Sequence, residues 1–390
     1  MNDIKSLRAM LYTLGNVTTK EVTKFAFMNK TADPVTKRRS QEIYDALSEK
    51  LNIYAWACGR YGQHMYSPEL GNQYAQELKK RILEEYDLSF DYSIQMAGHP
   101  VFHHMHPYFI IVDYIPFFDL SIFDKIHFPY VTKTYEANQD FLYYEAKGII
   151  TYTPIQRYML INWLNIDPCK VTSICSGVTG FVKENHKKVN TKNIIWVGKD
   201  FQRKGGKDVI EAFKILHQED SQYSLTMVGA DEDIECGHGI VSYPFMDDNF
   251  EKLNQLYDEA AVLVMPSYKE NLGLVYLEAM AHKIPVVVTS RGGFAEIIRR
   301  TGGGEVVRPG NIDDICDAIR TILNSSQYEQ YAEQAYNFAY KNARWDVAAD
   351  RMIDAMQRWM SGQPVPDDYN DYSICEKYEK YKTRINDGVK

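Results

Sequence analysis

The sequence predicts an α/β protein with two Rossmann-like domains, and three observations support this. From about Asn193 onward, short apolar runs alternate with segments of helical period, which is typical of βαβ units and a parallel sheet. The front half shows a similar but less regular alternation. Between the halves, TGFVKENHKKVNTKN is polar and lacks apolar periodicity, as a linker between domains does. We therefore expect the functional site in a cleft between the two domains.

The front half predicts a less regular α/β domain. Its first run, SLRAMLYTLG, fits either a strand or a helix, and the pattern leaves that choice open. Later strands are expected at 51–59, 91–100, 108–115 and 148–153, and amphipathic helices at 38–50 and 72–86.

The back half predicts a doubly wound domain in which strands and helices alternate. Strands are expected at 193–198, 224–229, 261–267 and 284–290, and helices at 205–218, 249–260 and 273–283. A further helix at 348–359 must stop before Gly362 and the two prolines that follow it. Beyond it, YSICEKYEKYKT places tyrosines at near-helical spacing, which predicts a last helix packed on the body of the protein.

Composition and charge disfavour several classes of protein. The formal net charge of -8 argues against a nucleic-acid-binding protein, which needs lysine and arginine in excess. The six cysteines show no CxxC or framework spacing, which indicates reduced thiols and disfavours a zinc site. The first residues lack the features of a secretory signal, and no run approaches the roughly 18 apolar residues of a membrane span. We expect a cytoplasmic protein whose basic segments at 35–40 and 77–81 give at most weak peripheral contact with the inner face of a membrane.

Two glutamates stand out in the otherwise apolar stretch VLVMPSYKENLGLVYLEAMAHKIPVVVTS. Burying an unpaired carboxylate costs several kcal/mol, so Glu270 and Glu278 need partners. If a helix begins just after Glu270, Asn271, Leu272 and Gly273 offer free backbone N–H groups that suit a diphosphate. The two carboxylates would then bracket a nucleotide-sugar, with Glu278 at a ribose diol. The alternative is a capping residue at 270 and an exposed helix residue at 278.

A second anion site is predicted in WVGKDFQRKGGKDVIEAF. Lys199, Arg203 and Lys204 follow an expected strand and precede a helix that opens near Gly205, so cations and backbone amides converge at the carboxyl end of a strand. The alternative interpretation is a solvated basic loop.

A cluster of histidines occurs in MAGHPVFHHMHPY. Its members are His99, His103, His104 and His106. Metal binding is disfavoured, because there is no HExxH pattern and no neighbouring set of cysteines or carboxylates.

The segment KENLGLVYLEAMAHKIPVVVTSRGGFAEII resembles the E-x7-E region of retaining GT-B glycosyltransferases of family 4. The resemblance continues through GGGEVVRPGNIDDICDAIRTIL and covers roughly 192–343. In that family the first glutamate contacts the transferred sugar, the backbone after it holds the diphosphate, and the second glutamate holds the ribose. The resemblance implies these roles for Glu270, for Gly273 with Leu274, and for Glu278.

Two further assignments follow from the resemblance. Lys204 and Gly205 match the second part of the family's phosphate-binding segment, whereas Lys199 stands where arginine is usual; this leaves open whether Lys199 or Arg203 contacts the phosphates. A histidine-bearing loop of the front domain faces the donor sugar in the family. This implies a catalytic role for His99, with His103 and His104 as alternatives, although a structural histidine fits equally well.

The resemblance also implies an architecture. It is GT-B, with two Rossmann-like domains facing across a cleft: an acceptor-binding domain at 1–183, a nucleotide-sugar-binding domain at 184–360 and a helical tail at 361–390. The D-x-D at Asp231 to Asp233 is the metal-nucleotide motif of the other large glycosyltransferase architecture, but we interpret it here as a solvated turn. No cofactor and no obligatory metal are expected.

The implied function is a retaining, metal-independent hexosyl transfer. The donor would be a nucleotide-diphosphate sugar and the acceptor a hydroxyl of a glycan or glycolipid, as in polysaccharide biosynthesis. Two alternatives stay open. One is a sugar-nucleotide epimerase or a phosphorylase of the same architecture, and the other is a catalytically inactive nucleotide-sugar-binding protein.

Overall fold

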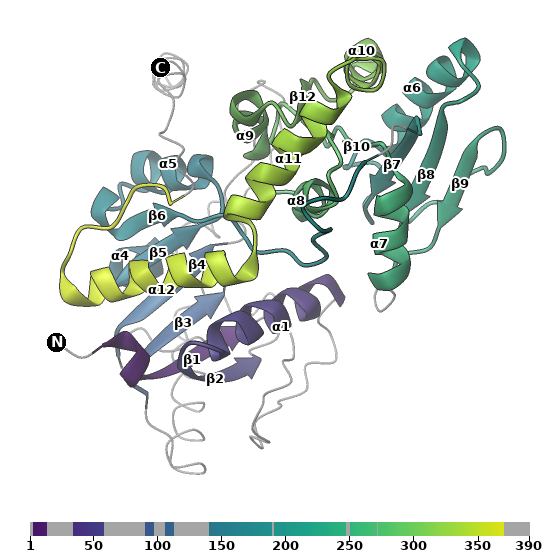
Figure 1. The fold of residues 1–390 in the computed structure, drawn as a ribbon. Helices are drawn as coiled ribbons and strands as arrows, with labels where there is room; N and C mark the ends of the chain where they lie inside the picture. The colour runs from purple at the N-terminus through teal and green to yellow at the C-terminus, as the bar shows by residue number, and fades with distance from the viewer. Residues whose placement is uncertain are drawn as a thin grey trace, which may run out of the picture. The chain divides into compact units, whose positions relative to one another are not determined.

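A computed structural model describes residues 3–13, 34–57, 90–96, 106–112, 140–188, 191–246, 250–270 and 272–369. These residues divide into two compact units, each built on a six-stranded sheet (Figure 1). Unit 1 contains the described residues up to 175 together with 348–369, and unit 2 contains those from 176 to 347. The α/β class predicted from the sequence is confirmed. Among the described residues, no helix has the length and apolar character needed to span a membrane.

Unit 1 is a parallel sheet with the strand order β2-β1-β3-β4-β5-β6. Its strands are β1 Arg8–Thr13, β2 Asn52–Ala57, β3 Tyr92–Met96, β4 Tyr108–Val112, β5 Gly148–Thr151 and β6 Val171–Ser173. Its helical segments are η1 Ile4–Ser6, α1 Pro34–Ser48, α4 Asp140–Glu145, α5 Pro154–Trp163, η5 Pro168–Lys170 and most of α12 Trp345–Ser361. The first run of the sequence is thus a strand, β1, because it pairs with both β2 and β3. The helix expected at 72–86 lies outside the described residues.

The interior of unit 1 is completed by a tryptophan from the end of α12. The Trp359 side chain is 5% exposed, and its indole N–H donates to the carbonyl oxygen of Cys169 at 2.8 Å. Its ring stacks on Phe109 of β4 with centroids 6.0 Å apart. The ring also occupies the space beside Gly148, where a Cβ atom would lie 2.1 Å from Trp359 Cε3. A central strand therefore begins with glycine because the indole needs that room.

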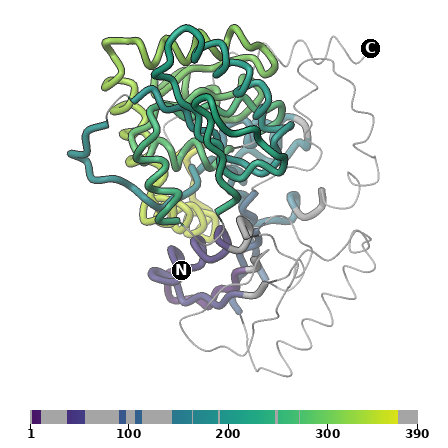
Figure 2. Tube along the Cα trace, turned by 90° about the vertical axis from the view of Figure 1, so that its right-hand side faces the viewer, coloured from purple at the N-terminus to yellow at the C-terminus, as the bar shows by residue number. Residues whose placement is uncertain are grey.

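The position of α12 differs from the domain boundaries expected from the sequence. We expected residues 184–360 to form one domain, but α12 from Ala348 onward belongs to unit 1. Its Gln357 Oε1 accepts a hydrogen bond from the backbone N–H of Ile4 at 2.6 Å, beside the start of the chain (Figure 2). Its Asp350 forms an ion pair with Lys50 at 2.6 Å. The amphipathic pattern predicts the helix itself but carries no information about which sheet the helix covers.

Unit 2 is a parallel sheet with the strand order β12-β11-β10-β7-β8-β9. Its strands are β7 Asn193–Val197, β8 Ser224–Val228, β9 Ile240–Tyr243, β10 Val262–Met265, β11 Val286–Thr289 and β12 Gly304–Val307. Its helices are α6 Gly206–Glu219, α7 Phe250–Glu259, α8 Leu274–Ala281, α9 Phe294–Thr301, α10 Ile312–Leu323 and α11 Tyr328–Asn342. The four strands predicted for this half are all present, whereas the edge strands β9 and β12 were not predicted.

The strand order of unit 2 places a topological switch point between β7 and β10. The first strand of unit 2 is β7. From there the chain continues outward through β8 and β9, and then returns to the other side of β7 to form β10, β11 and β12. This is the doubly wound order in which ligands bind outside the carboxyl ends of the two central strands. The loops that follow β7 and β10 are therefore where a site is expected.

Replacing Trp359 with alanine tests the dependence of unit 1 on α12. The change leaves a cavity beside Phe109 and removes a partly buried hydrogen bond, so we expect unit 1 to lose about 3–5 kcal/mol of unfolding free energy. Urea unfolding followed by circular dichroism measures it. The control is Val241→Ala on edge strand β9, where the side chain is 49% exposed and the effect should stay within about 0.5 kcal/mol. Equal effects of the two changes would contradict the role of Trp359.

Candidate functional site

The loop between β7 and α6 is shaped by glycines around Lys204. The aliphatic stem of Lys204 crosses Gly198, where a Cβ atom would lie 2.3 Å from Lys204 Cδ. Gly205 caps α6 in the left-handed conformation at φ 68°, which favours glycine. A Cβ atom at Gly205 would lie 2.8 Å from the carbonyl oxygen of Pro266, in the loop after β10. The sequence GG after Lys204 thus permits close approach of the two loops.

Arg203 joins the two loops directly. Its guanidinium Nε donates to Asp200 Oδ2 at 2.7 Å, and Nη1 donates to the carbonyl oxygen of Lys269 at 2.7 Å. The same Nη1 lies 3.8 Å from Glu270 Oε2. The backbone adds a second link, because the N–H of Tyr268 donates to the carbonyl oxygen of Arg203 at 2.8 Å. Arg203 therefore places a fixed positive charge beside the first predicted glutamate.

Lys199 lies over an aromatic ring. Its ammonium is 3.7 Å from the centroid of Phe245, which follows β9, and this geometry suits a cation–π contact. Sequence reasoning left open whether Lys199 or Arg203 contacts a phosphate. The structure places Arg203 beside Glu270 and places Lys199 over Phe245.

The D-x-D segment supports the loop after β7. Asp231 Oδ1 accepts a hydrogen bond from the backbone N–H of Phe201 at 2.9 Å, and Glu232 accepts one from the Gln202 side chain at 3.0 Å. Residues 231–233 are all exposed, as expected of a solvated turn. Among the residues that the structure describes, no three His, Cys, Asp or Glu side chains are placed to hold a metal ion.

The loop after β10 brings Glu270 to the start of α8. Gly273 caps the helix at φ 68°, and a Cβ atom there would lie 2.4 Å from the ring of Tyr276. The Tyr276 hydroxyl donates to the carbonyl oxygen of Met265 at 2.7 Å. Burial, with a contribution from the charge of Glu270, raises the pKa of Tyr276 well above its usual value. Glu270 also forms an isolated parallel bridge with Gly292, in the glycine turn after β11.

The second predicted glutamate is buried. Glu278 is 8% exposed, so the alternative of an exposed helix residue is wrong. Its Oε2 accepts a hydrogen bond from the hydroxyl of Tyr257 in α7 at 3.1 Å. The Tyr257 ring contacts the ring of His282, with centroids 5.3 Å apart. His282 Nδ1 lies 2.8 Å from Asp258 Oδ1, so this nitrogen carries the proton that the carboxylate accepts.

Burial controls the ionisation of the groups around Tyr257. Burial lowers the pKa of His282 below its usual value, although the bond to Asp258 opposes the shift. Burial also lowers the pKa of Lys188 to about 8. The Lys188 ammonium donates to the carbonyl oxygens of Tyr257 at 2.7 Å and Asp258 at 2.8 Å, at the carboxyl end of α7. A cation there complements the helix dipole.

The other predicted site residues have simple placements. Leu272 is buried, and Leu274 is the first residue of α8. Asn271, His99, His103 and His104 lie outside the described residues. His106 is half-buried, and burial lowers the pKa of its imidazole to about 4.

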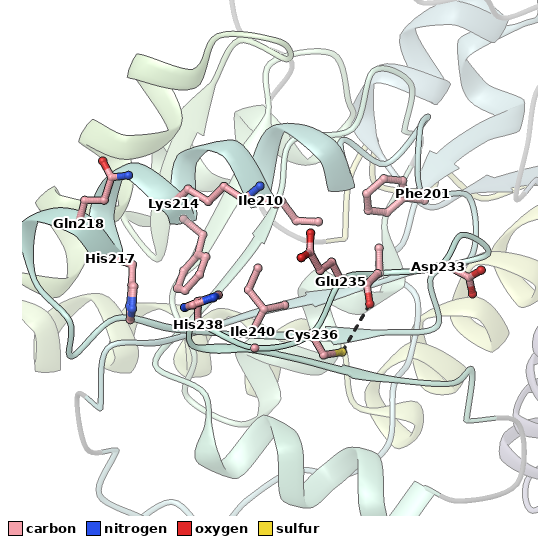
Figure 3. A pocket seen from close by; sticks show the side chains of 13 residues that line it. Phe201, Ile210, Lys214, His217, Gln218, Asp233, Glu235, Cys236, His238 and Ile240 are labelled. Carbon is pink, nitrogen blue, oxygen red and sulfur yellow. Dashed lines mark hydrogen bonds between the residues drawn. The ribbon is translucent and has the colours of Figure 1, made fainter.

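A pocket of about 600 Å³ lies elsewhere in unit 2 (Figure 3). It is the space between α6 and the loop that leads into β9, with Lys214 and His217 on one side and Glu235 and His238 on the other. None of the predicted donor-binding residues lines it. Half of its lining side chains are exposed, and its polar groups do not converge on one point. We therefore place the candidate site at the loops after β7 and β10.

Three residues of the site were missed by sequence reasoning. Asp200 stands three residues before Arg203, a spacing that suits an ion pair in a turn and was open to recognition. Tyr257 and Tyr276 carry no such signal. Each looks like an ordinary aromatic residue of an amphipathic helix, and only the packing of the helices reveals the partner of its hydroxyl.

Comparison with known proteins finds a sequence family that unit 2 resembles. Residues 179–341 match the family described as glycosyl transferases group 1. This segment is less than half of the chain and lies within unit 2. Over 173 residues, or 42% of the chain, the sequence is 32% identical to an uncharacterized glycosyltransferase of Methanocaldococcus jannaschii. The match spans 44% of that relative, less than half of its length.

Solved structures extend the likeness to the whole fold. Sucrose-phosphate synthase from Thermosynechococcus elongatus has a TM-score of 0.67 at 15% identity, over 92% of this chain and 100% of that chain. HepE of Anabaena in complex with UDP and glucose has a TM-score of 0.62 at 14% identity, over 90% of this chain and 99% of that chain. At these identities the likeness concerns the fold alone. The chain has the fold of GT-B glycosyltransferases, as the sequence predicted.

The lowered pKa of His282 predicts a pH-dependent stability. The folded protein holds the imidazole of His282 neutral. The contribution of His282 to the free energy of unfolding is therefore present above pH 6.5 and is lost as the pH falls toward the pKa of the folded state. We expect the stability difference between wild type and His282→Gln to shrink from pH 7.5 to pH 5, measured by urea unfolding. The matched control is His238→Asn, at an exposed histidine with positive φ, which should leave the pH dependence unchanged. A difference that stays constant with pH would contradict the prediction.

Proposed function

We propose that the protein is a glycosyltransferase that moves a sugar from a nucleotide-diphosphate sugar to a hydroxyl of a glycan or glycolipid. The proposal includes retention at the anomeric carbon and independence of metal ions, both by resemblance to glycosyltransferase family 4. The group 1 match of residues 179–341 supports the class of activity. The likeness to HepE, solved with UDP and glucose, supports a nucleoside diphosphate and a sugar as ligands.

The observation that carries the proposal is the meeting of the loops after β7 and β10 at the switch point of unit 2. The loop after β7 supplies Lys204 and Arg203, and the loop after β10 supplies Glu270 and the amino end of α8. Arg203 holds the loops together through its bond to the carbonyl oxygen of Lys269. Cations, helix-terminal amides and a carboxylate in one place suit a ligand with a diphosphate next to a sugar.

The leaving group in such a transfer is a nucleoside diphosphate. As the bond from the anomeric carbon to the phosphate oxygen breaks, negative charge grows on the diphosphate. In our proposal Lys204, Arg203 and the backbone N–H groups of Gly273 and Leu274 stabilise that charge, because they are fixed before the reaction starts. Lys199 would act at the outer edge of this region, beside Phe245.

The two glutamates have different tasks in the proposal. Glu270 accepts hydrogen bonds from hydroxyls of the transferred sugar. It also stabilises the positive charge that develops at the ring of that sugar. Glu278 accepts a hydrogen bond from a hydroxyl of the ribose. His99 is proposed to face the sugar from the front domain, where it lies outside the described residues. The acceptor is a hydroxyl whose oxygen forms the new bond to the anomeric carbon.

The nucleotide is identified by a thermal-shift panel of UDP, GDP, ADP, CMP and their sugar conjugates, with and without Mg²⁺. A ligand at 100 times its Kd adds about 2.7 kcal/mol of stability, so we expect a clear rise in midpoint with one nucleotide. The rise should be the same with and without Mg²⁺. A shift that requires Mg²⁺ would contradict metal independence. No shift with any nucleotide would contradict the proposed donor site. In a separate assay of products, conversion of the donor without an acceptor would favour an epimerase.

Lys204→Ala tests the phosphate role. Loss of a fixed cation at the leaving group should lower turnover about 100-fold, while stability changes by less than about 1 kcal/mol. Sugar release from the donor identified in the panel measures turnover, and thermal unfolding measures stability. Lys207→Ala is the matched control, because Lys207 is an exposed lysine of α6 close by in sequence and should retain wild-type turnover. Equal turnover in the two variants would overturn the assignment.

A further inference from the structure

We propose that Tyr257 is a positioning residue that holds the Glu278 carboxylate in the orientation needed to accept a ribose hydroxyl. The inference rests on the proposed function, since it takes Glu278 as the ribose contact. It adds a residue from a different helix, which neither the E-x7-E segment nor its spacing contains.

The hydrogen bond has a defined direction and a protected setting. Glu278 is the fifth residue of α8, and Tyr257 lies in the last turn of α7. An ionised carboxylate only accepts, so the Tyr257 hydroxyl is the donor in the 3.1 Å bond to Oε2. Tyr257 is 1% exposed and Glu278 is 8% exposed. A bond to a charged group in such a setting is stronger than one between neutral groups.

Tyr257 is itself held in place from two sides. Its ring contacts His282, which is 3% exposed and bonded to Asp258 at 2.8 Å. Its backbone carbonyl accepts from the buried Lys188 ammonium at 2.7 Å. The phenol therefore reaches Glu278 from a position fixed by its neighbours, and the carboxylate meets a preorganised donor.

This arrangement affects one part of the ligand more than the others. A carboxylate has about four acceptor positions, and the bond from Tyr257 engages one of them and restrains the plane of Glu278. Without the phenol, the carboxylate loses that restraint and its orientation toward the ribose changes. The loss concerns the ribose hydroxyls and leaves contacts to the base and the diphosphate unchanged.

The test compares ribonucleotides with analogues that lack both ribose hydroxyls. UDP, GDP and ADP are each titrated by calorimetry into the full chain, alongside their 2′,3′-dideoxy forms. We expect the wild-type protein to bind the ribose form with a dissociation constant about tenfold lower than that of the dideoxy form. Tyr257→Phe should weaken the ribose form by about tenfold and change the dideoxy form by less than about twofold, as removal of one bond to a charged group predicts.

Tyr328→Phe is the matched control. It also removes a buried tyrosine hydroxyl from unit 2, one that donates to the carbonyl oxygen of Ala261 at 2.9 Å. This variant should lower the thermal midpoint and leave the preference for ribose unchanged. A role of Tyr257 in stability alone would instead make the two variants alike.

Glu278→Gln separates the failure of this inference from the failure of the proposed function. If Glu278→Gln reduces the preference for ribose and adding Tyr257→Phe causes no further loss, the inference is supported. If Glu278→Gln reduces the preference but Tyr257→Phe retains it, only the inference is overturned. If Glu278→Gln has no effect, or no nucleotide binds, the proposed ribose contact fails as well. Tyr257→Met, which removes the hydroxyl and keeps a long apolar side chain, replaces Tyr257→Phe should that variant not fold.

Discussion

The parallel pairing of β7 with β10 is the contact on which the candidate site depends. It sets Ile194 beside Val262 and Ile195 beside Leu263, so both strands end at the same edge of the sheet. Two loops that are far apart in the chain meet there, and Arg203 bonds to Lys269 across a separation of 66 residues.

The two glutamates of unit 2 are accommodated by different chemistry. Glu270 lies beside the guanidinium of Arg203, so a positive charge offsets its own. Glu278 Oε2 accepts a hydrogen bond from the neutral hydroxyl of Tyr257. A hydrogen bond to a carboxylate is stronger in a buried place than in water. The difference suits a division of tasks in which one glutamate works next to phosphates and the other next to neutral hydroxyls.

Much of unit 2 was predictable from sequence, because strands of a buried parallel sheet are continuous apolar runs. The runs VLVM and VVVT are of this kind and form β10 and β11. The short strand β9 buries only its first residue, Ile240, and gave no such signal. Glu270 and Lys204 were selected as candidates from the sequence because charges in apolar or glycine-rich surroundings are conspicuous. Tyr257 and the return of α12 to unit 1 were not predictable. Both depend on which helix packs where, and an amphipathic pattern gives only the apolar face.

The group 1 segment nearly coincides with unit 2, since the match covers 179–341 and the unit covers the described residues from 176 to 347. The likeness in fold extends over 92% of the chain. The described residues of unit 2 lie in one stretch of sequence, from 176 to 347, interrupted only by a few residues outside the described part. Unit 1 is different, because Trp359 fills the space at Gly148 from beyond the end of unit 2. A cut after the group 1 segment would remove that tryptophan, so the front domain depends on the residues that follow the back domain.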